Sequence, residues 1–334
     1  MRHPAVLYNK LANNNVQCAL CAHRCMIAPG TFGICGMREN EGGTLVTHSY
    51  GKLIASHVDP IEKKPLYHFI PASFSFSVAT FGCNFQCNFC QNWQISQRNQ
   101  RDGGVRGEAT SPISIVNAAR KADCKSISYT YTEPTIFFEY ALDIAKKAHE
   151  HNIKNVFVTN GYMTEEALDM IMPYLDAANV DLKSSSDDFY KKLCKARVQP
   201  VMDTIKRMHE RNIWVEVTTL IIPEENDSEG DLSAIARFIA SVSPDIPWHI
   251  SRFRPEYEFT DRHATPIETL RKAYDIGINA GLKYVYMGNV TEGADTYCPG
   301  CGEFLVKRMY MFSEENKIKA GKCPACNYQI AGVW

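Results

Sequence analysis

Directly after an apolar run, one short loop of the chain reads Phe81-Gly82-Cys83-Asn84-Phe85-Gln86-Cys87-Asn88-Phe89-Cys90-Gln91-Asn92-Trp93. Its cysteines have the spacing C-x3-C-x2-C and supply three thiolates. Structural zinc and cubane iron–sulfur clusters both usually take four protein ligands. Three thiolates on one loop can therefore hold three irons of a [4Fe–4S] cluster and leave the fourth iron open to a small molecule. The alternatives are reduced thiols in a turn, or a zinc site completed by a distant residue, although a zinc knuckle normally has C-x2-C on both arms.

An open iron beside a sulfonium can pass one electron into it and break a carbon–sulfur bond, with the cofactor supplying the reactivity. The loop resembles the signature of radical SAM enzymes, which use S-adenosylmethionine (SAM), and Phe89 also fits that pattern. The resemblance implies a [4Fe–4S] cluster bound by Cys83, Cys87 and Cys90, which are then both metal ligands and the catalytic centre, with SAM as the second cofactor.

Composition restricts the possible partners and compartment. The chain has 334 residues, 36 of them basic and 37 acidic, which suits one large α/β domain or a core domain with small appendages. Without a long basic run, the composition does not support a nucleic-acid partner. No signal peptide and no run of about 18 apolar residues is evident, so the sequence predicts a cytoplasmic protein without membrane contact.

Apolar β-branched runs alternate with helical patterns along the middle of the chain. Such alternation implies parallel strands joined by right-handed crossovers, and six or seven units predict a partial, curved (βα)6-type barrel. Functional groups of such sheets collect beyond the carboxyl ends of the strands. The expected strands are Phe74–Thr80, Ser126–Tyr131, Asn155–Thr159, Asn179–Leu182, Trp214–Ile222, Trp248–Arg252 and Lys283–Met287. The expected helices are Ile113–Ala122, Ile136–His149, Glu165–Tyr174, Asp188–Cys194, Met202–Glu210, Leu232–Val242 and Ile267–Asn279.

Tyr131-Thr132-Glu133-Pro134 follows the second expected strand. Radical SAM enzymes carry a Gly-Gly-Glu-Pro-like segment here, which holds the methionyl ammonium of SAM. Glu133 and Pro134 are kept, whereas Tyr131 and Thr132 replace the glycines, so the carboxylate can still pair with an ammonium. The alternative is an ordinary strand-to-helix turn with proline at the first helical position.

The next strand ends add further polar groups. Thr159-Asn160-Gly161 ends the third strand and is, by itself, a common turn. Asp181 and Lys183 end the fourth strand and project the same way at i and i+2, as a ribose acceptor and a cation for the methionyl carboxylate. The pair resembles Asp-x-Lys of the pyruvate formate-lyase activating enzyme branch, and an exposed salt bridge is the alternative.

Beyond the later strands, the alignment of the sequence with the family motifs is not fixed to a single residue. The segment containing Thr219 resembles the fifth-strand motif that packs on adenine, and Met287 ends the last expected strand. In activating enzymes a histidine near the end of the sixth strand meets the SAM ribose. Here either His249 or Arg254 takes that position.

Eleven of the thirteen cysteines fall into three tight groups, which in a large chain without a signal indicates metal binding. Two C-P-x-C knuckles, Cys298/Cys301 and Cys323/Cys326, make a closed four-thiolate site that suits structural zinc, with a further iron or iron–sulfur centre as the alternative. At the other end, a second four-thiolate set leaves its metal undetermined between iron–sulfur and zinc. Its members are Cys18, Cys21, Cys25 and Cys35.

Four segments are expected. Residues 1–45 form a cysteine-rich segment, 46–72 a connection that contains Asp59-Pro60-Ile61-Glu62-Lys63-Lys64-Pro65-Leu66, 73–290 the partial barrel, and 291–334 a zinc-ribbon or rubredoxin-like segment. The connection either lines the mouth of the barrel or is a solvated linker. Cys124 and Cys194 are expected to be buried structural thiols.

Together these motifs resemble the radical SAM enzymes of AmmeMemoRadiSam systems, relatives of pyruvate formate-lyase activating enzymes. The resemblance implies reductive cleavage of SAM to methionine and a 5′-deoxyadenosyl radical that abstracts hydrogen from an unidentified substrate. It also implies a flavodoxin- or ferredoxin-type reductant and companion proteins of the Memo and AMMECR-like types. The alternatives are an activating enzyme that installs a glycyl radical on a partner protein, and an iron–sulfur or zinc interaction or sensor protein without turnover.

Overall fold

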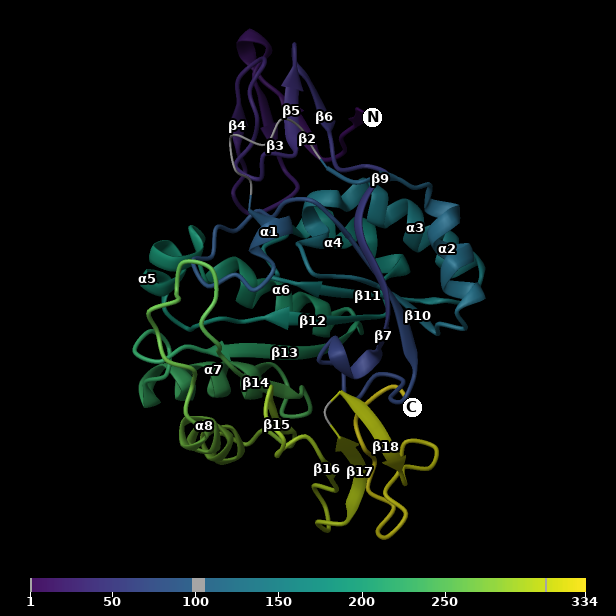
Figure 1. Cartoon of the computed structure of the whole chain (residues 1–334), viewed down its shortest axis with the longest axis vertical. Coiled ribbons are helices and arrows are strands. Elements are labelled where there is room, and N and C mark those ends of the chain that lie inside the picture. The colour runs from purple at the N-terminus through teal and green to yellow at the C-terminus, as the bar shows by residue number, and fades with distance from the viewer. Residues whose placement is uncertain (1, 98–105, 310) are drawn as a thin grey trace.

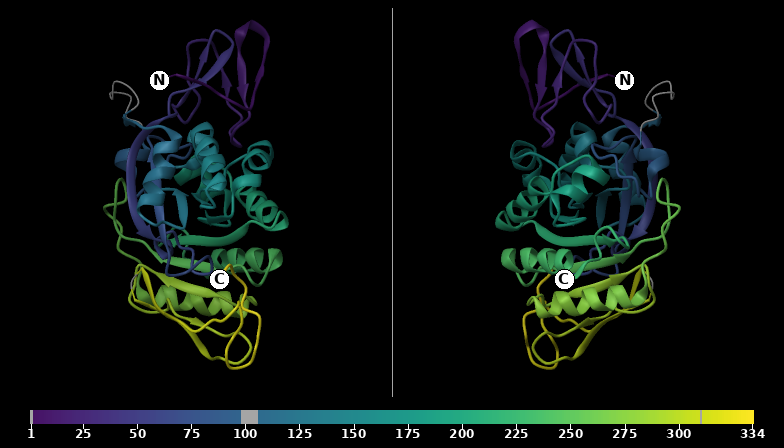
Figure 2. Two further views of the ribbon diagram at one scale, coloured as in Figure 1. Left: turned by 90° about the vertical axis from the view of Figure 1, so that its right-hand side faces the viewer. Right: turned by 90° about the vertical axis from the view of Figure 1, so that its left-hand side faces the viewer.

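The computed structural model describes residues 2–97, 106–309 and 311–334. A central sheet with its helices lies between two small β modules at opposite ends of the longest axis (Figure 1). The purple N-terminal module lies at the top and the yellow C-terminal module at the bottom. Both side views show the same arrangement (Figure 2).

Within the described residues, nine strands form the central sheet in the order β15-β14-β13-β12-β11-β10-β8-β7-β9. The seven strands from β8 to β15, β9 excepted, are all parallel and follow one another in chain order. Because β15 and β9 remain edges, the barrel is open, and the predicted α/β partial barrel is confirmed. The strands are β7 Lys52–Pro60, β8 Phe74–Thr80, β9 Glu108–Ala109, β10 Ser126–Tyr129, β11 Lys154–Thr159, β12 Ala177–Asp181, β13 Trp214–Ile221, β14 Trp248–Arg252 and β15 Val285–Gly288.

Helices connect the parallel strands, as right-handed crossovers require. Their buried apolar stripes form the core with the outer face of the sheet. On the last helix Gly277 permits close packing, because a Cβ there would lie 2.8 Å from Val285 Cγ2. The helices are α1 Trp93–Ser96, α2 Pro112–Lys121, α3 Phe138–Glu150, α4 Glu165–Ile171, α5 Asp187–Phe189, α6 Gln199–Glu210, α7 Glu229–Val242 and α8 Ile267–Asn279.

The sequence placed most of these elements closely. The predicted bounds of β8, β14 and α8 agree with the structure, and the expected last strand begins two residues later than predicted, at Val285. The expected helix Asp188–Cys194 is a short α5 that continues into a π-helical turn over Tyr190–Cys194.

Part of the expected connection 46–72 is a strand of the sheet. Strand β7 pairs antiparallel with β8, from Leu53 opposite Thr80 to Pro60 opposite Phe74. A short 3-10 turn, Ile61–Lys63, follows it. The buried carboxylate of Glu216 on β13 then accepts the backbone N–H groups of Tyr67 (3.0 Å) and His68 (2.8 Å). The connection is therefore fixed against the inner face of the sheet.

The two terminal modules are small antiparallel sheets, and none of the helices in the described residues is long and apolar enough to cross a membrane. The N-terminal module contains β1 His3–Pro4, β2 Tyr8–Lys10, β3 Val16–Cys18, β4 Met26–Ile27, β5 Arg38–Glu41 and β6 Thr44–Thr47. The C-terminal module contains β16 Thr296–Tyr297, β17 Phe304–Met309 and β18 Phe312–Asn316.

Candidate functional site

The predicted signature cysteines line one cavity of about 530 Å³ at the carboxyl ends of the parallel strands. The same cavity is lined by groups from the ends of β10, β11 and β12, as the strand-end rule predicts. Among the predicted site residues, those that line it are Cys83, Cys87, Cys90, Phe89, Thr132, Glu133, Thr159, Asn160, Asp181 and Lys183.

Local hydrogen bonds hold the loop in shape. The Phe85 N–H donates to the Cys83 sulfur at 3.3 Å, and the Cys90 sulfur lies 3.0 Å from the Ser96 hydroxyl. Gly82 has φ +103°, a conformation that favours glycine. The loop therefore presents three thiols toward one space.

A buried thiol outside the loop, that of Cys194, contacts one of the three signature cysteines. Cys194, in the π-helical turn, contacts Cys87, and this contact together with burial raises the pKa of the Cys87 thiol. The backbone N–H of Gln86 donates to the Cys194 carbonyl at 3.1 Å. The expectation that Cys194 is a buried thiol is confirmed, but its contact with Cys87 was not anticipated, because the two are far apart in sequence.

Glu133 is buried and is held by hydrogen bonds from neighbouring strand ends. Its Oε1 accepts the Thr135 N–H (3.0 Å) and hydroxyl (2.6 Å) and the Thr159 hydroxyl (2.8 Å). Within residues 2–97, 106–309 and 311–334, its Oε2 accepts only the Asn160 N–H, at 2.8 Å. Burial raises the pKa of Glu133, although these donors oppose the shift. The remaining acceptor capacity of Oε2 suits an ammonium group.

Asp181 and Lys183 lie side by side at the end of β12. The Lys183 ammonium is 2.9 Å from Asp181 Oδ2 and 5.9 Å from the centre of the Phe89 ring. Burial by itself lowers the pKa of Lys183, but the Asp181 carboxylate and the neighbouring thiols raise it above its usual value. The lysine is therefore charged at neutral pH inside the cavity.

A second cavity of about 590 Å³ adjoins the first, and both are lined by Thr218, Ser251, Asn289 and Met311. His249 and Arg254, predicted near the ribose, and Met287, predicted to bind the cofactor, line this second cavity. His249 is buried, and its Nε2 lies 2.6 Å from the Glu216 carboxylate. Arg254 is exposed.

Three predicted site residues do not line either cavity. The hydroxyl of Thr219 instead donates to the Leu182 carbonyl at 2.7 Å and accepts the Trp248 indole N–H at 2.9 Å. Because side chains alternate along a strand, Thr218 and Leu220 line the cavity instead. Pro134 is buried at the start of a 3-10 turn, and Gly161 supplies a turn with φ +69°.

Sequence reasoning also missed a charge cluster on the cavity wall, in which Asp59 and Lys64 are buried and Lys63 is exposed. Asp59 at the end of β7 binds the Lys63 ammonium at 2.8 Å and the Lys64 ammonium at 2.6 Å, and it accepts the hydroxyl groups of Ser77 (2.8 Å) and Tyr131. Burial lowers the pKa of Lys64 to about 8 although Asp59 opposes the shift. The motif that contains these lysines was visible, but only folding shows that they face the signature loop across one cavity.

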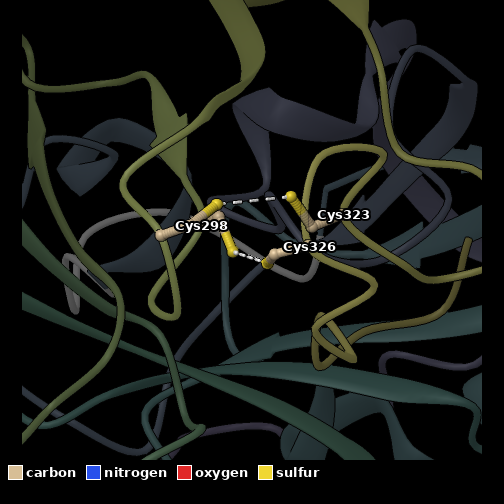
Figure 3. Close-up of side chains that lie close together, drawn as sticks. Cys298, Cys323 and Cys326 are labelled. Atoms are coloured by element: carbon tan, nitrogen blue, oxygen red, sulfur yellow. Dashed lines mark hydrogen bonds between the residues drawn. The ribbon is translucent and has the colours of Figure 1, made fainter.

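The C-terminal cysteines form a compact set. The sulfurs of Cys298, Cys301, Cys323 and Cys326 all lie within 4.8 Å of one another, and Figure 3 shows three of them at close range. Burial raises the pKa of the Cys323 thiol, but the backbone N–H groups of Cys326 and Ala325 lower it to about 7. This site is able to bind a metal ion.

The N-terminal cysteines are also brought together. Cys18, at the end of β3, lies with Cys21, Cys25 and Cys35 around one small hollow. The hollow is lined by His23 and Arg38 as well. Among the described residues, however, these four sulfurs do not form a set within 4.8 Å, and neither do those of the signature loop.

The signature loop fits a cubane cluster. In a cubane cluster each cysteine binds a different iron. The cysteine sulfurs are therefore farther apart than four cysteine sulfurs that bind one zinc ion. The three thiols lie around one cavity without the compact spacing of the C-terminal set. A cubane bound by these three cysteines alone would keep one iron free of protein ligands.

Comparison with known proteins agrees with this geometry. Residues 77–236 match the model of the radical SAM superfamily. "Uncharacterized protein MJ0808" of Methanocaldococcus jannaschii is 44% identical over 332 residues, which cover 98% of each chain. A protein of the same organism named as a putative glycyl-radical enzyme activating enzyme is 25% identical over 68% of this chain and 83% of its own length.

A solved structure has a similar fold. A radical SAM methyltransferase from Sphaerobacter thermophilus superposes with a TM-score of 0.52 at 17% identity, over 71% of each chain. The family implies a [4Fe–4S] cluster and SAM as cofactors, and the signature loop has the ligands for the cluster. From its three-thiolate loop, its open parallel sheet and these relatives, the chain belongs to the radical SAM superfamily and is an enzyme.

Proposed function

We propose that the cavity lined by the signature loop holds a cluster on Cys83, Cys87 and Cys90 and binds SAM beside that cluster. A reduced cluster bound there would supply the electron for cleavage of SAM to methionine and a 5′-deoxyadenosyl radical. The observation that carries this assignment is that the three thiols share one cavity with an acidic group and an ion pair suited to an amino acid.

The residues of the chain then orient SAM. Glu133 Oε2 accepts the methionyl ammonium, and Lys183 binds the methionyl carboxylate. Asp181 accepts the ribose hydroxyl groups. Thr218 has a buried hydroxyl without a partner among the described residues and lies between the two cavities. We place it at the adenosyl end, where His249 or Arg254 and Met287 follow.

The wall formed by β7 and the following turn supports a polar substrate. Lys63 and Lys64 line the first cavity and bind Asp59. The adjoining cavity is lined by charged groups of both signs: Glu62, Lys63, Arg254 and Glu256. We infer that the substrate binds here, across the cavity from the signature loop, where burial limits access of water to the radical.

We also propose zinc for the C-terminal site. Four sulfurs at about 2.3 Å from one zinc ion lie about 3.8 Å apart in a tetrahedron. Cys298 and Cys326 sulfurs are 3.6 Å apart, and those of Cys301 and Cys323 are 3.8 Å apart. All four positions are protein ligands, so the ion is structural, and residues 291–334 form a separate module beside the partial barrel.

The relatives suggest a protein substrate and a reductant for members of this group. For this chain we propose a one-electron donor of the flavodoxin or ferredoxin type. The motif resemblance supports an AmmeMemoRadiSam-type enzyme with Memo-type and AMMECR-like companion proteins. Mixing purified companions with the enzyme and SAM, and searching for a modified product, tests this assignment.

Turnover of SAM tests the central proposal. Anaerobically reconstituted protein with dithionite and SAM should form 5′-deoxyadenosine, and Cys87→Ala should form none above background. Cys124→Ala changes another buried cysteine outside the three groups and should retain the rate. Equal turnover by Cys87→Ala would contradict the proposal.

A further inference from the structure

The four N-terminal cysteines enclose a hollow in which the protein provides every ligand. Cys18, Cys21, Cys25 and Cys35 line it with Arg38. Four thiol groups around one hollow are a ligand set that fits either one tetrahedral metal ion or an iron–sulfur cluster.

The spacing of the sulfurs distinguishes between the possible metals. One tetrahedral zinc requires sulfurs about 3.8 Å apart, as the C-terminal set has them. The N-terminal sulfurs are gathered around one hollow but, among the described residues, do not form a set within 4.8 Å. They share this property with the signature cysteines, whose arrangement fits a cubane.

A buried cation without full hydrogen bonding points to the same conclusion. Arg38 is 1% exposed, donates to the Cys18 sulfur at 3.4 Å, and pairs with Glu139. Its Nε has no hydrogen-bond partner in the described part of the chain. An unsatisfied buried N–H is costly, and a cluster with several thiolates and sulfides supplies both an acceptor and negative charge.

We propose that Cys18, Cys21, Cys25 and Cys35 hold a second [4Fe–4S] cluster. Four thiolates occupy all four irons, so this cluster has no open position for SAM and serves electron transfer rather than chemistry on a substrate.

The position of the N-terminal hollow indicates that a cluster there would transfer its electron to the signature cluster. His23 Nε2 lies 2.9 Å from the carbonyl of Asn84, the residue after Cys83. The Tyr162 ring lies between the His23 ring, 4.8 Å away, and the Phe85 ring, 5.1 Å away. Cys35 and Cys83 also line one common surface hollow. The two cysteine sets are therefore in contact through packed side chains.

This role rests on the proposed function of the signature loop. A reduced flavodoxin- or ferredoxin-type protein loses one electron, the signature cluster gains it, and no bond forms or breaks at the N-terminal site. The N-terminal module is then the entry point for the electron that SAM cleavage consumes.

Metal content of the unmodified protein is the first test, because it does not depend on a variant that folds. Anaerobically reconstituted protein should contain about eight irons and about one zinc per chain. About four irons with about two zincs would place zinc in the N-terminal hollow and overturn the proposal.

Reciprocal variants then assign the clusters. Cys21→Ser/Cys25→Ser should lose about four irons, keep its zinc, and still change its electron paramagnetic resonance spectrum when SAM is added. Cys87→Ala should also lose about four irons but show no SAM-dependent change. Cys301→Ser is the matched control and should lose zinc alone. An unchanged iron content in the N-terminal double variant would contradict the second cluster.

The electron route has its own measurement. Stopped-flow reduction of the signature cluster by reduced flavodoxin should slow at least tenfold in Cys21→Ser/Cys25→Ser. If the signature cluster is reduced at the same rate in the variant and in the unmodified protein, the electron route is contradicted. The assignment of the N-terminal cluster is then still decided by the iron content. SAM cleavage by Cys87→Ala would refute the proposed function and leave the N-terminal iron count unaffected, so the two failures are distinguishable.

Discussion

The two cysteine-rich modules at the ends of the molecule differ in what their cysteines face (Figure 1). The C-terminal sulfurs face one another in a compact set, with Cys301 and Cys326 exposed. The N-terminal sulfurs surround a hollow that adjoins the signature loop. If the two proposed assignments hold, the C-terminal cysteines stabilise a small module through one metal ion, and the N-terminal cysteines hold a cluster close to the signature loop.

The modules are also attached differently. Arg38 of the N-terminal module pairs with Glu139 on α3, and Thr164 before α4 donates to the Ala19 carbonyl at 2.7 Å. The C-terminal module contacts the turn after β7: Ser313 donates to Glu62 at 2.5 Å, and Met311 lines both cavities. The C-terminal module therefore also contributes to the site, through the β17–β18 hairpin rather than through its metal.

Removal of the C-terminal metal should have the largest effect on this comparison. In Cys301→Ser the module loses a ligand of an ion that contributes on the order of 10 kcal/mol to folding small zinc modules. We expect loss of about one zinc per chain and rapid proteolysis within residues 291–334, observed by mass spectrometry. Retention of zinc and of protease resistance would show that the module is stable by its own core.

Substitution of Gly82 should have an intermediate effect, because this glycine joins the N-terminal module to the signature loop. An alanine Cβ would lie 3.0 Å from Met37 Cγ, at a backbone with φ +103°. We expect Gly82→Ala to lower the free energy of unfolding by about 1–3 kcal/mol, measured by urea denaturation. Gly42→Ala is the matched control, since its φ is +60° and nothing lies within 4 Å. Equal losses in the two variants would mean that the contact with Met37 is unimportant.

The smallest effect is expected at the tip of the C-terminal hairpin. Met311 lines both cavities, whereas Met309 on the same hairpin lines neither. Met311→Ala should weaken SAM binding roughly threefold in isothermal titration, because it removes part of one apolar wall. Met309→Ala should bind SAM as the unmodified protein does. If the two variants behave alike, the hairpin does not contribute to the SAM cavity.

Much of the fold and the site was predictable because the deciding signals are local. The alternation of apolar runs and helical patterns placed the parallel strands within a few residues, as for β8 and β14. The three signature cysteines lie within one short loop, so their spacing alone limits the ligands that they can offer. Asp181 and Lys183, two residues apart on a strand, project to the same side as expected.

Contacts between distant segments were not predictable in the same way. An error of one residue in aligning the motif decides whether Thr218 or Thr219 is expected to line the cavity, because successive side chains on a strand point to opposite faces. The sequence did not indicate that β7 joins the sheet or that Cys194 touches Cys87. It also did not place Met311 over the cavities. These facts depend on how separate segments pack.

By itself the sequence determined the chemistry available to this protein: three thiolates on one loop, two four-thiolate sets, and polar groups at the ends of parallel strands. Only the tertiary structure decided which of these groups share a space. The physical reason is that ligand spacing within a loop is fixed by the chain, whereas the distance between two loops is fixed by side-chain packing across the core.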